Sequence, residues 1–267
     1  MTNLFEYNFM RLAFAAILII TPLLGILGTM VVQKKMAFFS DALGHSALTG
    51  IALGLLLGIT GPSLAMLLYG LVFALLLNAI QRHSLSSTDT VISVFASGST
   101  AIGLAILSKG GNFSSYSALL IGDILSITRS EVFSLLGILL VTVLFWCLCA
   151  NRLVAISIHP TMARSANISV RLMENVFSLL IAAVVMLSIR WVGILLISAL
   201  MIIPAASSRN ISCNMREYHV YSLIFSMFSG VIGLVTSYYS NVATGPMIVI
   251  VASIIYFATY FYGRRVK

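Results

Sequence analysis

The amino-acid sequence predicts an all-α fold, a polytopic transmembrane helical bundle with eight or nine spans. Hydrophobic residues make up 60% of the 267 residues and charged residues only 8%, whereas soluble domains carry about 25% charged residues. The apolar runs are about 18–22 residues long, which matches the thickness of a bilayer. These runs do not alternate with a period of two, as barrel strands do. The backbone is therefore expected to satisfy its polar groups within helices.

Nine apolar segments follow one another along the chain, and each is expected to form a helix. The second and seventh are short, so either could be a broken or partial span. No stretch could form a separate soluble domain, so residues 1–267 are predicted to be one transmembrane domain. The approximate ranges of the segments are 12–32, 42–59, 64–80, 90–107, 132–150, 172–189, 192–206, 220–238 and 246–262.

The basic residues predict how the chain is oriented. If the N-terminus lies outside and every segment crosses, the inside loops hold eleven of the 15 Lys and Arg residues and the outside loops hold four. The positive-inside rule therefore places the N-terminus outside and the C-terminus inside. The formal charge of +8 then reflects basic cytoplasmic loops and not a nucleic-acid partner. The inside residues are Lys34, Lys35, Arg82, Arg152, Arg164, Arg171, Arg209, Arg216, Arg264, Arg265 and Lys267.

Two connections are long enough to carry structure of their own. The outside connection covers residues 108–131, and its moderately apolar stretch 117–127 is expected to form a short or re-entrant helix. Within it, Asp123 is expected to stabilise a turn or cap a helix. The inside connection covers residues 151–171.

Asp41 and His45 are the candidate metal ligands, at the start of the second segment. On a helix, their spacing of four residues corresponds to about 40° around the axis and about 6 Å along it, so both side chains share one face. A carboxylate and an imidazole suit zinc, manganese or ferrous iron, and ionisable groups inside a membrane usually mark an ion path. The alternative is a hydrogen bond between the two that joins helices. Two residues cannot complete a tetrahedral shell, so water or a second copy of the chain would supply further ligands.

Other positions are expected to shape how the helices pack and move. Small residues follow the pair at every fourth position, where they form a groove that lets another helix approach closely. Pro204, near the end of the seventh segment, interrupts the hydrogen-bond ladder. It is expected to kink or end its helix, either as a hinge or simply to shape the bundle. The small residues are Ser46, Gly50, Gly54 and Gly58.

Several catalytic motifs are absent from the sequence. It contains no G-x-x-x-x-G-K-[ST], so an ATP-driven process would need a separate ATPase chain. It also lacks H-E-x-x-H and the nucleophile elbow, which argues against an intramembrane enzyme. A metal transporter driven by an ion gradient, without an ATPase, stays open as an alternative. A permease for a vitamin or siderophore is disfavoured, because such ligands need a wide apolar cavity in place of Asp41 and His45.

Four blocks of the sequence are distinctive when they are taken together and in order. They are KMAFFSDALGHSALTG at 35–50, LIGDILSI at 120–127, VGILLISALMIIPAA at 192–206 and TGP at 244–246. In these blocks the chain resembles the permease subunits of the zinc, manganese and iron branch of ABC importers, and it is most similar to the zinc permeases.

The resemblance implies a permease, not an enzyme, in the bacterial cytoplasmic (inner) membrane, where it contacts lipid. It would work as a dimer, a homodimer of this chain, with two ATP-binding cassette subunits that bind and hydrolyse ATP. An extracytoplasmic binding protein would deliver a divalent metal, zinc before manganese or iron, to Asp41 and His45. No covalently bound cofactor and no nucleic acid are implied. The inside stretch 154–166 resembles the region that docks onto the ATPase, through Ile158, His159, Pro160, Thr161, Met162, Ala163 and Arg164.

Overall fold

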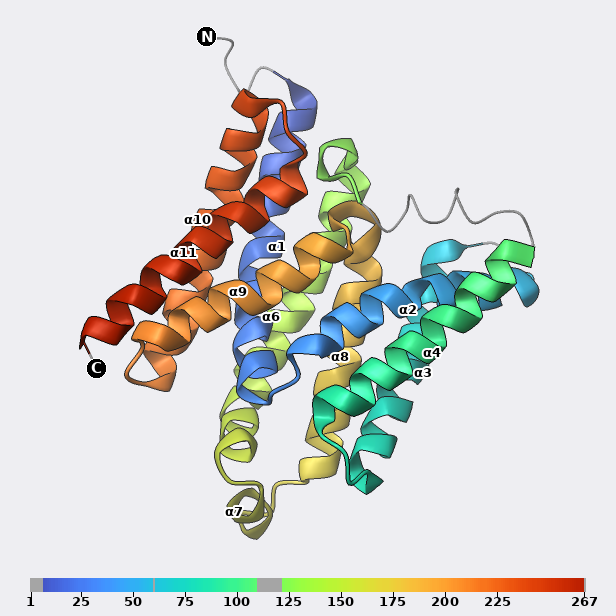
Figure 1. Cartoon of the computed structure of the whole chain (residues 1–267), viewed down its shortest axis with the longest axis vertical. Helices are drawn as coiled ribbons and strands as arrows, with labels where there is room; N and C mark the ends of the chain where they lie inside the picture. Colours follow the sequence, from blue (N-terminus) through green and yellow to red (C-terminus); the bar gives the residue numbers. More distant parts are fainter. Residues whose placement is uncertain (1–6, 60, 110–121, 267) are drawn as a thin grey trace. The chain divides into compact units, whose positions relative to one another are not determined.

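The computed structural model describes residues 7–59, 61–109 and 122–266, and every element in these ranges is helical. The predicted all-α fold class is therefore confirmed, and all nine apolar segments form helices (Figure 1). The long helices are α1 (Asn8–Gln33), α2 (Ala37–Leu56), α3 (Pro62–His83), α4 (Thr88–Lys109), α6 (Arg129–Ile158), α8 (Val170–Val192), α9 (Ile194–Ile211), α10 (Met215–Ser240) and α11 (Thr244–Val266). Two short helices, η1 (Ile124–Ser126) and α7 (Pro160–Ser165), lie in the two long connections.

Eight of these described helices have the length and hydropathy needed to cross a membrane. The ninth, α2, is not among them, because Asp41, His45 and several small polar residues lower its hydropathy. The result agrees with the predicted eight or nine spans, and it identifies α2 as the unusual helix. The inside and outside assignment stays a prediction.

The outside connection is described only in part, since residues 117–121 of its predicted short helix lie outside the described residues. The remainder contains η1, which Asp123 caps: the backbone N–H of Leu125 donates to Asp123 Oδ1 at 3.0 Å. The expected capping role of Asp123 is confirmed. Glu131 accepts hydrogen bonds from the backbone N–H and the hydroxyl of Thr128, both at 2.8 Å, at the start of α6.

The chain divides into two compact units. Unit 1 comprises residues 1–32, 123–144 and 191–267, and it contains α1, the first half of α6, α9, α10 and α11. Unit 2 comprises residues 33–122 and 145–190, and it contains α2, α3, α4, the second half of α6, α7 and α8. The two units use a similar local arrangement: α9 packs against α10 and α11, and α2 packs against α3 and α4.

In unit 1, small residues bring α1 and α10 into close contact. The hydroxyls of Ser222 and Ser226 donate to the carbonyls of Gly25 and Thr21 at 2.8 and 2.7 Å. A Cβ on Gly25 would lie only 2.9 Å from the Cβ of Ser226. Small side chains that let two backbones approach are typical of helix contacts in membranes, where burial alone gives little driving force.

In unit 2, Gly50 and Gly54 lie at the contact between α2 and α3. A Cβ on Gly50 would lie 3.0 Å from the Cβ of Tyr69, and a Cβ on Gly54 would overlap that of Ala65. The expected groove does not extend to Gly58, which lies past the end of α2 with open space around it.

Gly58 ends α2 in place of packing against it. Its φ of 73° lies in the left-handed region that favours glycine. The N–H of Gly58 bonds to the carbonyl of Leu55 at 3.2 Å, and that of Ile59 bonds to the carbonyl of Gly54 at 2.8 Å. These two bonds form a Schellman motif, a common way to end a helix.

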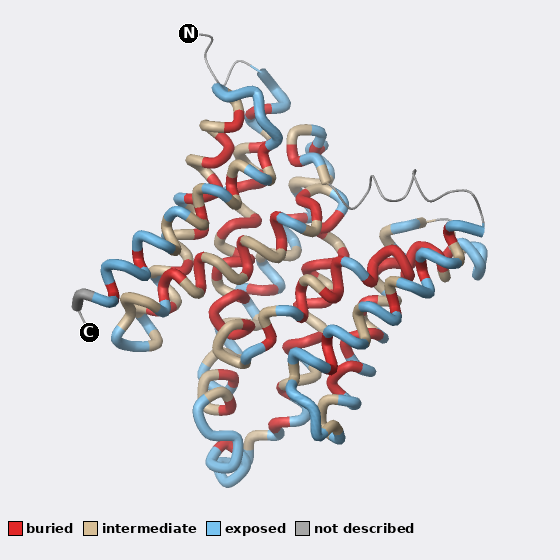
Figure 2. The backbone as a smooth tube through the Cα atoms, in the orientation of Figure 1, coloured by how far each residue is buried: buried red, intermediate tan, exposed pale blue. Residues whose placement is uncertain are grey.

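Burial differs strongly from helix to helix (Figure 2). Within an 18-residue window, 67% of α1 is buried, against 17% of α11 and 11% of α6. Along α6, Leu140, Leu144 and Leu148 are each more than 60% exposed. In water such apolar surface would be costly, but in a bilayer it can face lipid.

Candidate functional site

Asp41 and His45 form the one opening in an otherwise buried stretch of α2. From Phe39 to Ala52, all residues except Asp41 and His45 are buried. The side chains of Asp41 and His45 are 45% and 56% exposed. A helix covered on nearly all sides therefore presents to its surroundings a carboxylate and an imidazole.

The two side chains share a face, as their spacing predicts. His45 Nε2 lies 3.8 Å from Asp41 Oδ1. This distance is within the range of an ion pair but too long for a good hydrogen bond. Because both residues belong to α2, this contact does not join two helices. A metal ion bound by both groups would need only a small side-chain adjustment.

The exposed face cannot be explained by contact with lipid alone. A carboxylate on a helix within a bilayer is costly unless it faces water, a cavity or another polar surface. In the described part of the chain, no cluster of three or more His, Cys, Asp or Glu could hold a metal ion. Asp41 and His45 of a single chain would therefore supply only two of the ligands that a metal ion needs. Water or a second copy must supply what is missing from a coordination shell.

A polar cluster fixes α2 one turn beyond His45. The hydroxyl of Thr49 donates to the carbonyl of Ser99 on α4 at 2.6 Å. The Ser99 hydroxyl in turn donates to Thr49 Oγ1 at 3.2 Å, and it lies 2.6 Å from the hydroxyl of Tyr69 on α3. A Cβ on Gly103 would lie 2.7 Å from the Thr49 backbone, so α4 approaches α2 closely here. The cluster thus links α2 to α3 and α4 one turn beyond its exposed pair, and it restrains the rotation of α2 there.

No sequence motif announces this polar cluster. Thr49 and Ser99 are 50 residues apart, and Tyr69 is 30 residues from Ser99. Serine and threonine within helices usually bond to a carbonyl of their own helix, so their presence does not reveal a contact between helices.

The predicted ATPase-docking residues lie at the turn that contains α7. The preceding helix α6 runs to Ile158, and the extended residue His159 (φ −146°, ψ 94°) leads into α7, which begins at Pro160. The side chains of Ile158 and Met162 are 61% and 69% exposed. Of the predicted set, Ala163 is buried, whereas the other six residues, Ile158, His159, Pro160, Thr161, Met162 and Arg164, are exposed. The exposed apolar and basic side chains make a surface that could bind a protein.

Pro204 lies inside α9, which continues to Ile211. The proline therefore does not end its helix, which was one of its two expected effects. Because proline has no N–H, the carbonyl of Leu200 lacks its usual helical partner. A Cβ on Gly28 of α1 would lie 2.8 Å from the carbonyl carbon of Met201, so α9 is also closely packed one turn before the proline.

Comparison with known proteins gives consistent matches along nearly the whole chain. The ABC 3 transport family model matches residues 6–263. The high-affinity zinc uptake system membrane protein ZnuB of Haemophilus influenzae is 30% identical over 244 residues, which cover 90% of this chain and 92% of that protein. The manganese transport system membrane protein MntC of Listeria monocytogenes is 25% identical over 263 residues, which cover 98% of this chain and 94% of that protein.

A solved structure has the same fold. The structure of PsaBC from Streptococcus pneumoniae in complex with Fab superposes with a TM-score of 0.82 at 24% identity. The match covers 96% of this chain and 92% of the PsaBC chain.

Proposed function

This chain belongs to the ABC 3 transport family, and we propose that it is the permease through which zinc enters the cytoplasm. It is a membrane transport subunit of a divalent metal importer, and ATP is hydrolysed by a separate ATPase chain. Family membership therefore disfavours the alternative of a transporter driven by an ion gradient alone.

Zinc as the substrate has two supports. The zinc-uptake relative is 30% identical to this chain, whereas the manganese-transport relative is 25% identical. In addition, sites that contain imidazole bind Zn²⁺ more tightly than Mn²⁺ under the Irving–Williams order. Manganese is the second candidate, and iron the third.

The exposed Asp41 and His45 on a buried helix are the observation that carries this proposal. In a dimer, two copies of the pair could meet and complete a site that one copy leaves open. Zinc delivered by an extracytoplasmic binding protein would shed part of its hydration and be held by these four side chains. Binding must be weak enough to allow release on the other side. Only a neutral imidazole binds metal, so acid would compete with zinc at His45.

The surface from Ile158 to Arg164 is proposed to dock the ATPase. Closure of two ATPase subunits would push on this surface and switch the bundle between outward-open and inward-open states. In the predicted orientation, the basic loops lie on the cytoplasmic side of the bacterial inner membrane. This surface would then be on the side where ATP is available.

A transport assay tests the proposed site. The complex with its ATPase and binding protein is reconstituted in vesicles, and ATP-dependent uptake of zinc, manganese and iron is compared. Asp41→Ala and His45→Ala are each expected to reduce zinc uptake by at least about tenfold. Mutation of a residue that only hydrogen-bonds to a metal ligand already lowers metal affinity or activity by about that factor. Asp89→Ala and His83→Ala, at exposed helix ends, are matched controls that should transport normally. Wild-type uptake in both site variants would rule out the site, and faster uptake of manganese would rule out zinc as the substrate.

A further inference from the structure

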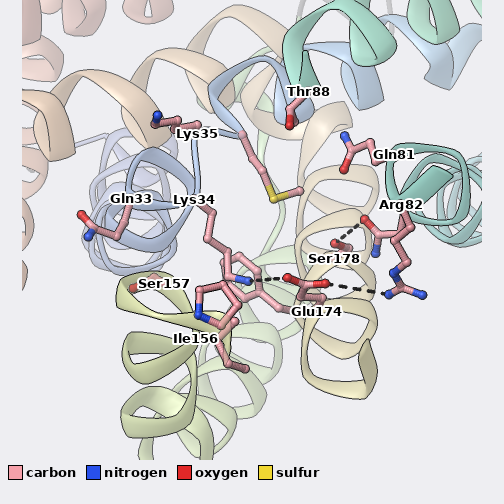
Figure 3. Close-up of a pocket in the computed structure, with 14 residues that line it drawn as sticks. Gln33, Lys34, Lys35, Gln81, Arg82, Thr88, Ile156, Ser157, Glu174 and Ser178 are labelled. Carbon is pink, nitrogen blue, oxygen red and sulfur yellow. Dashed lines mark hydrogen bonds and ion pairs between the residues drawn. The ribbon is translucent and has the colours of Figure 1, made fainter. Parts of the chain in front are cut away.

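A charged cavity of about 420 Å³ lies within unit 2, where several of its long helices end (Figure 3). Its walls include Gln33 at the end of α1, Arg82 at the end of α3, Thr88 at the start of α4 and Glu174 in the first turns of α8. Because the ends of membrane-crossing helices lie near the bilayer surface, the cavity is at one membrane boundary and not in its middle.

Glu174 lies between two cationic side chains from different elements. Lys34, in the connection that leads into α2, places Nζ 3.6 Å from Glu174 Oε1. Arg82 of α3 places Nη2 4.0 Å from Glu174 Oε2. Figure 3 shows the two cations approaching the carboxylate from opposite sides. One carboxylate therefore joins the segment before α2 to α3 and α8.

The positive charge of Lys34 needs the Glu174 carboxylate as a partner because Lys34 is almost buried. Its side chain is only 9% exposed. Burial lowers the pKa of the Lys34 ammonium, and the nearby Glu174 carboxylate opposes that shift. Of the described residues that line the cavity, Lys34, Lys35 and Arg82 are cationic and only Glu174 is anionic. Breaking a buried ion pair on one side leaves the other charge uncompensated.

The contact between α3 and α8 has further bonds that do not involve Glu174. The guanidinium of Arg82 donates to Asn175 Oδ1 at 2.7 Å and to the carbonyl of Arg171 at 3.2 Å. The amide of Asn78 donates to Asn175 Oδ1 at 3.3 Å, and Ser178 donates to Asn78 Oδ1 at 3.2 Å. Loss of the Glu174 charge should therefore leave α3 and α8 together, and should mainly release Lys34.

The position of Lys34 connects this cavity with the candidate metal site. Lys34 precedes the first residue of α2 by three positions and Asp41 by seven. The same cavity is lined by Ile156 and by Pro160, which begins α7. The segment that leads into the helix with Asp41 and the start of the predicted docking helix thus line the same cavity.

We propose that Glu174 is a positioning residue for transport, whose ion pair with Lys34 makes the start of α2 follow movements of the α6–α7 junction. This proposal rests on the proposed function, in which α7 receives the force of the ATPase and α2 holds the metal. In the structure the pair is joined, with 3.6 Å between Lys34 Nζ and Glu174 Oε1, and the proposal adds a second state in which it is separated. When it is joined, movement of α8 and the α7 region is transmitted to Lys34, and from Lys34 to the face with Asp41. When it is separated, the ATPase can still cycle but α2 no longer responds.

The test measures how many zinc ions enter vesicles per ATP hydrolysed by the full complex. Glu174→Gln keeps the size of the side chain and removes its charge. ATP hydrolysis is expected to continue, while zinc uptake per ATP falls roughly two- to thirtyfold, the range seen when coupling networks are mutated. Glu217→Gln is the matched control, because Glu217 is also near a helix start, in the first turn of α10 in unit 1. Its carboxylate accepts only local hydrogen bonds, from the backbone N–H of Cys213 at 2.9 Å and from the side-chain amide of Asn214 at 2.8 Å. Its uptake per ATP should equal that of the wild type.

A double-mutant cycle separates positioning from a general loss of stability. Lys34→Met should lower uptake per ATP as Glu174→Gln does, and the double variant should be no worse than either single one, since both remove one interaction. Lys34→Arg keeps the positive charge, so its zinc uptake per ATP should stay close to that of the wild type. If Glu174→Gln does not assemble, Lys34→Met and Lys34→Arg still give the comparison.

Two results would overturn the positioning role: an unchanged ratio in Glu174→Gln or Lys34→Met, or independent losses that multiply in the double variant. Absence of ATP-dependent uptake of any of the three metals by the wild-type complex would instead overturn the proposed function.

Discussion

The short helices α2 and α9 occupy similar places in their own units and differ in what they carry. Each has about five turns, 20 and 18 residues, and each packs against the two helices that follow it in the chain. Asp41 and His45 lie within α2, whereas α9 has no ionisable residue before Arg209 and has Pro204 in its interior. We propose that one arrangement serves two purposes, ligand binding in α2 and bending in α9.

The two helices are also anchored at different points. The bond from Thr49 to Ser99 fixes α2 near its middle, one turn beyond His45. Polar anchors of α9 lie near its end: the Ser208 hydroxyl donates to the carbonyl of Tyr218 at 2.6 Å, and the Asn210 amide donates to Thr259 Oγ1 at 3.3 Å. An anchor beside the candidate ligands limits their movement, while an anchor at one end leaves the region around the proline less restrained.

The largest expected effect tests how tightly α2 is held. Gly103→Ala on α4 places a methyl group against the Thr49 backbone, with 2.7 Å to both its N and Cα, where only a backbone shift could relieve the overlap. Such overpacking costs about 1–3 kcal/mol or more, and we expect zinc uptake to be lost because α2 is displaced beside His45. Thermal unfolding in detergent and vesicle uptake measure the two effects.

Gly98→Ala on the same helix is the control for that substitution. Nothing lies within 4 Å of a Cβ at Gly98, so the better helix propensity of alanine should make this variant as stable as the wild type or up to about 1 kcal/mol more stable. Equal unfolding temperatures and equal uptake for the two variants would show that α4 does not constrain α2.

A smaller effect is expected from the anchor itself. In Thr49→Val, the new side chain has nearly the same shape as threonine. The change removes the hydroxyl that donates to the Ser99 carbonyl and accepts from the Ser99 hydroxyl. An unsatisfied buried polar group costs about 1–3 kcal/mol. We expect lower stability together with weaker zinc binding by the assembled complex, because the rotation of the Asp41 and His45 face becomes less defined. Calorimetric zinc titration checks this result.

Ser208→Ala provides the matching variant on α9, since it removes one buried hydroxyl that donates to the carbonyl of Tyr218. It should reduce stability by a similar amount and leave zinc affinity unchanged. If both variants weaken zinc binding equally, the anchor on α2 has no special relation to the site, and the contrast between the two helices fails.

The apolar pattern predicted the helices of this fold well, and it predicted helix ends less well. All nine runs form helices because each can bury or expose to lipid a long apolar surface. The helix from Arg129 to Ile158 extends beyond its apolar run, 132–150, because the backbone can stay helical outside the hydrocarbon. The spacing predicts Gly58 in a packing groove, because glycine at a fourth position suits both a groove and a helix end. Only the φ of 73° distinguishes the two roles.

The candidate ligands followed from a local spacing, but their support did not. Asp41 and His45 are four residues apart, so helix geometry alone places them on one face. Thr49 and Ser99 meet across 50 residues, and Lys34 and Glu174 across 140. A single sequence contains no periodic pattern that indicates such distant pairs. The sequence therefore predicts Lys34 only as a basic residue in an inside loop.

The smallest expected effect concerns the proline that distinguishes α9. Pro204→Ala restores an N–H that can bond to the carbonyl of Leu200, so α9 becomes stiffer and the unfolding temperature should rise. Pro22→Ala in α1 makes the same chemical change inside another spanning helix, and it should also raise the unfolding temperature. If α9 bends during transport, only Pro204→Ala slows zinc uptake, by a few-fold, with zinc affinity unchanged. Equal uptake by both variants would mean that Pro204 shapes the bundle and does not act as a hinge, and the difference between α2 and α9 would then be limited to the ligands.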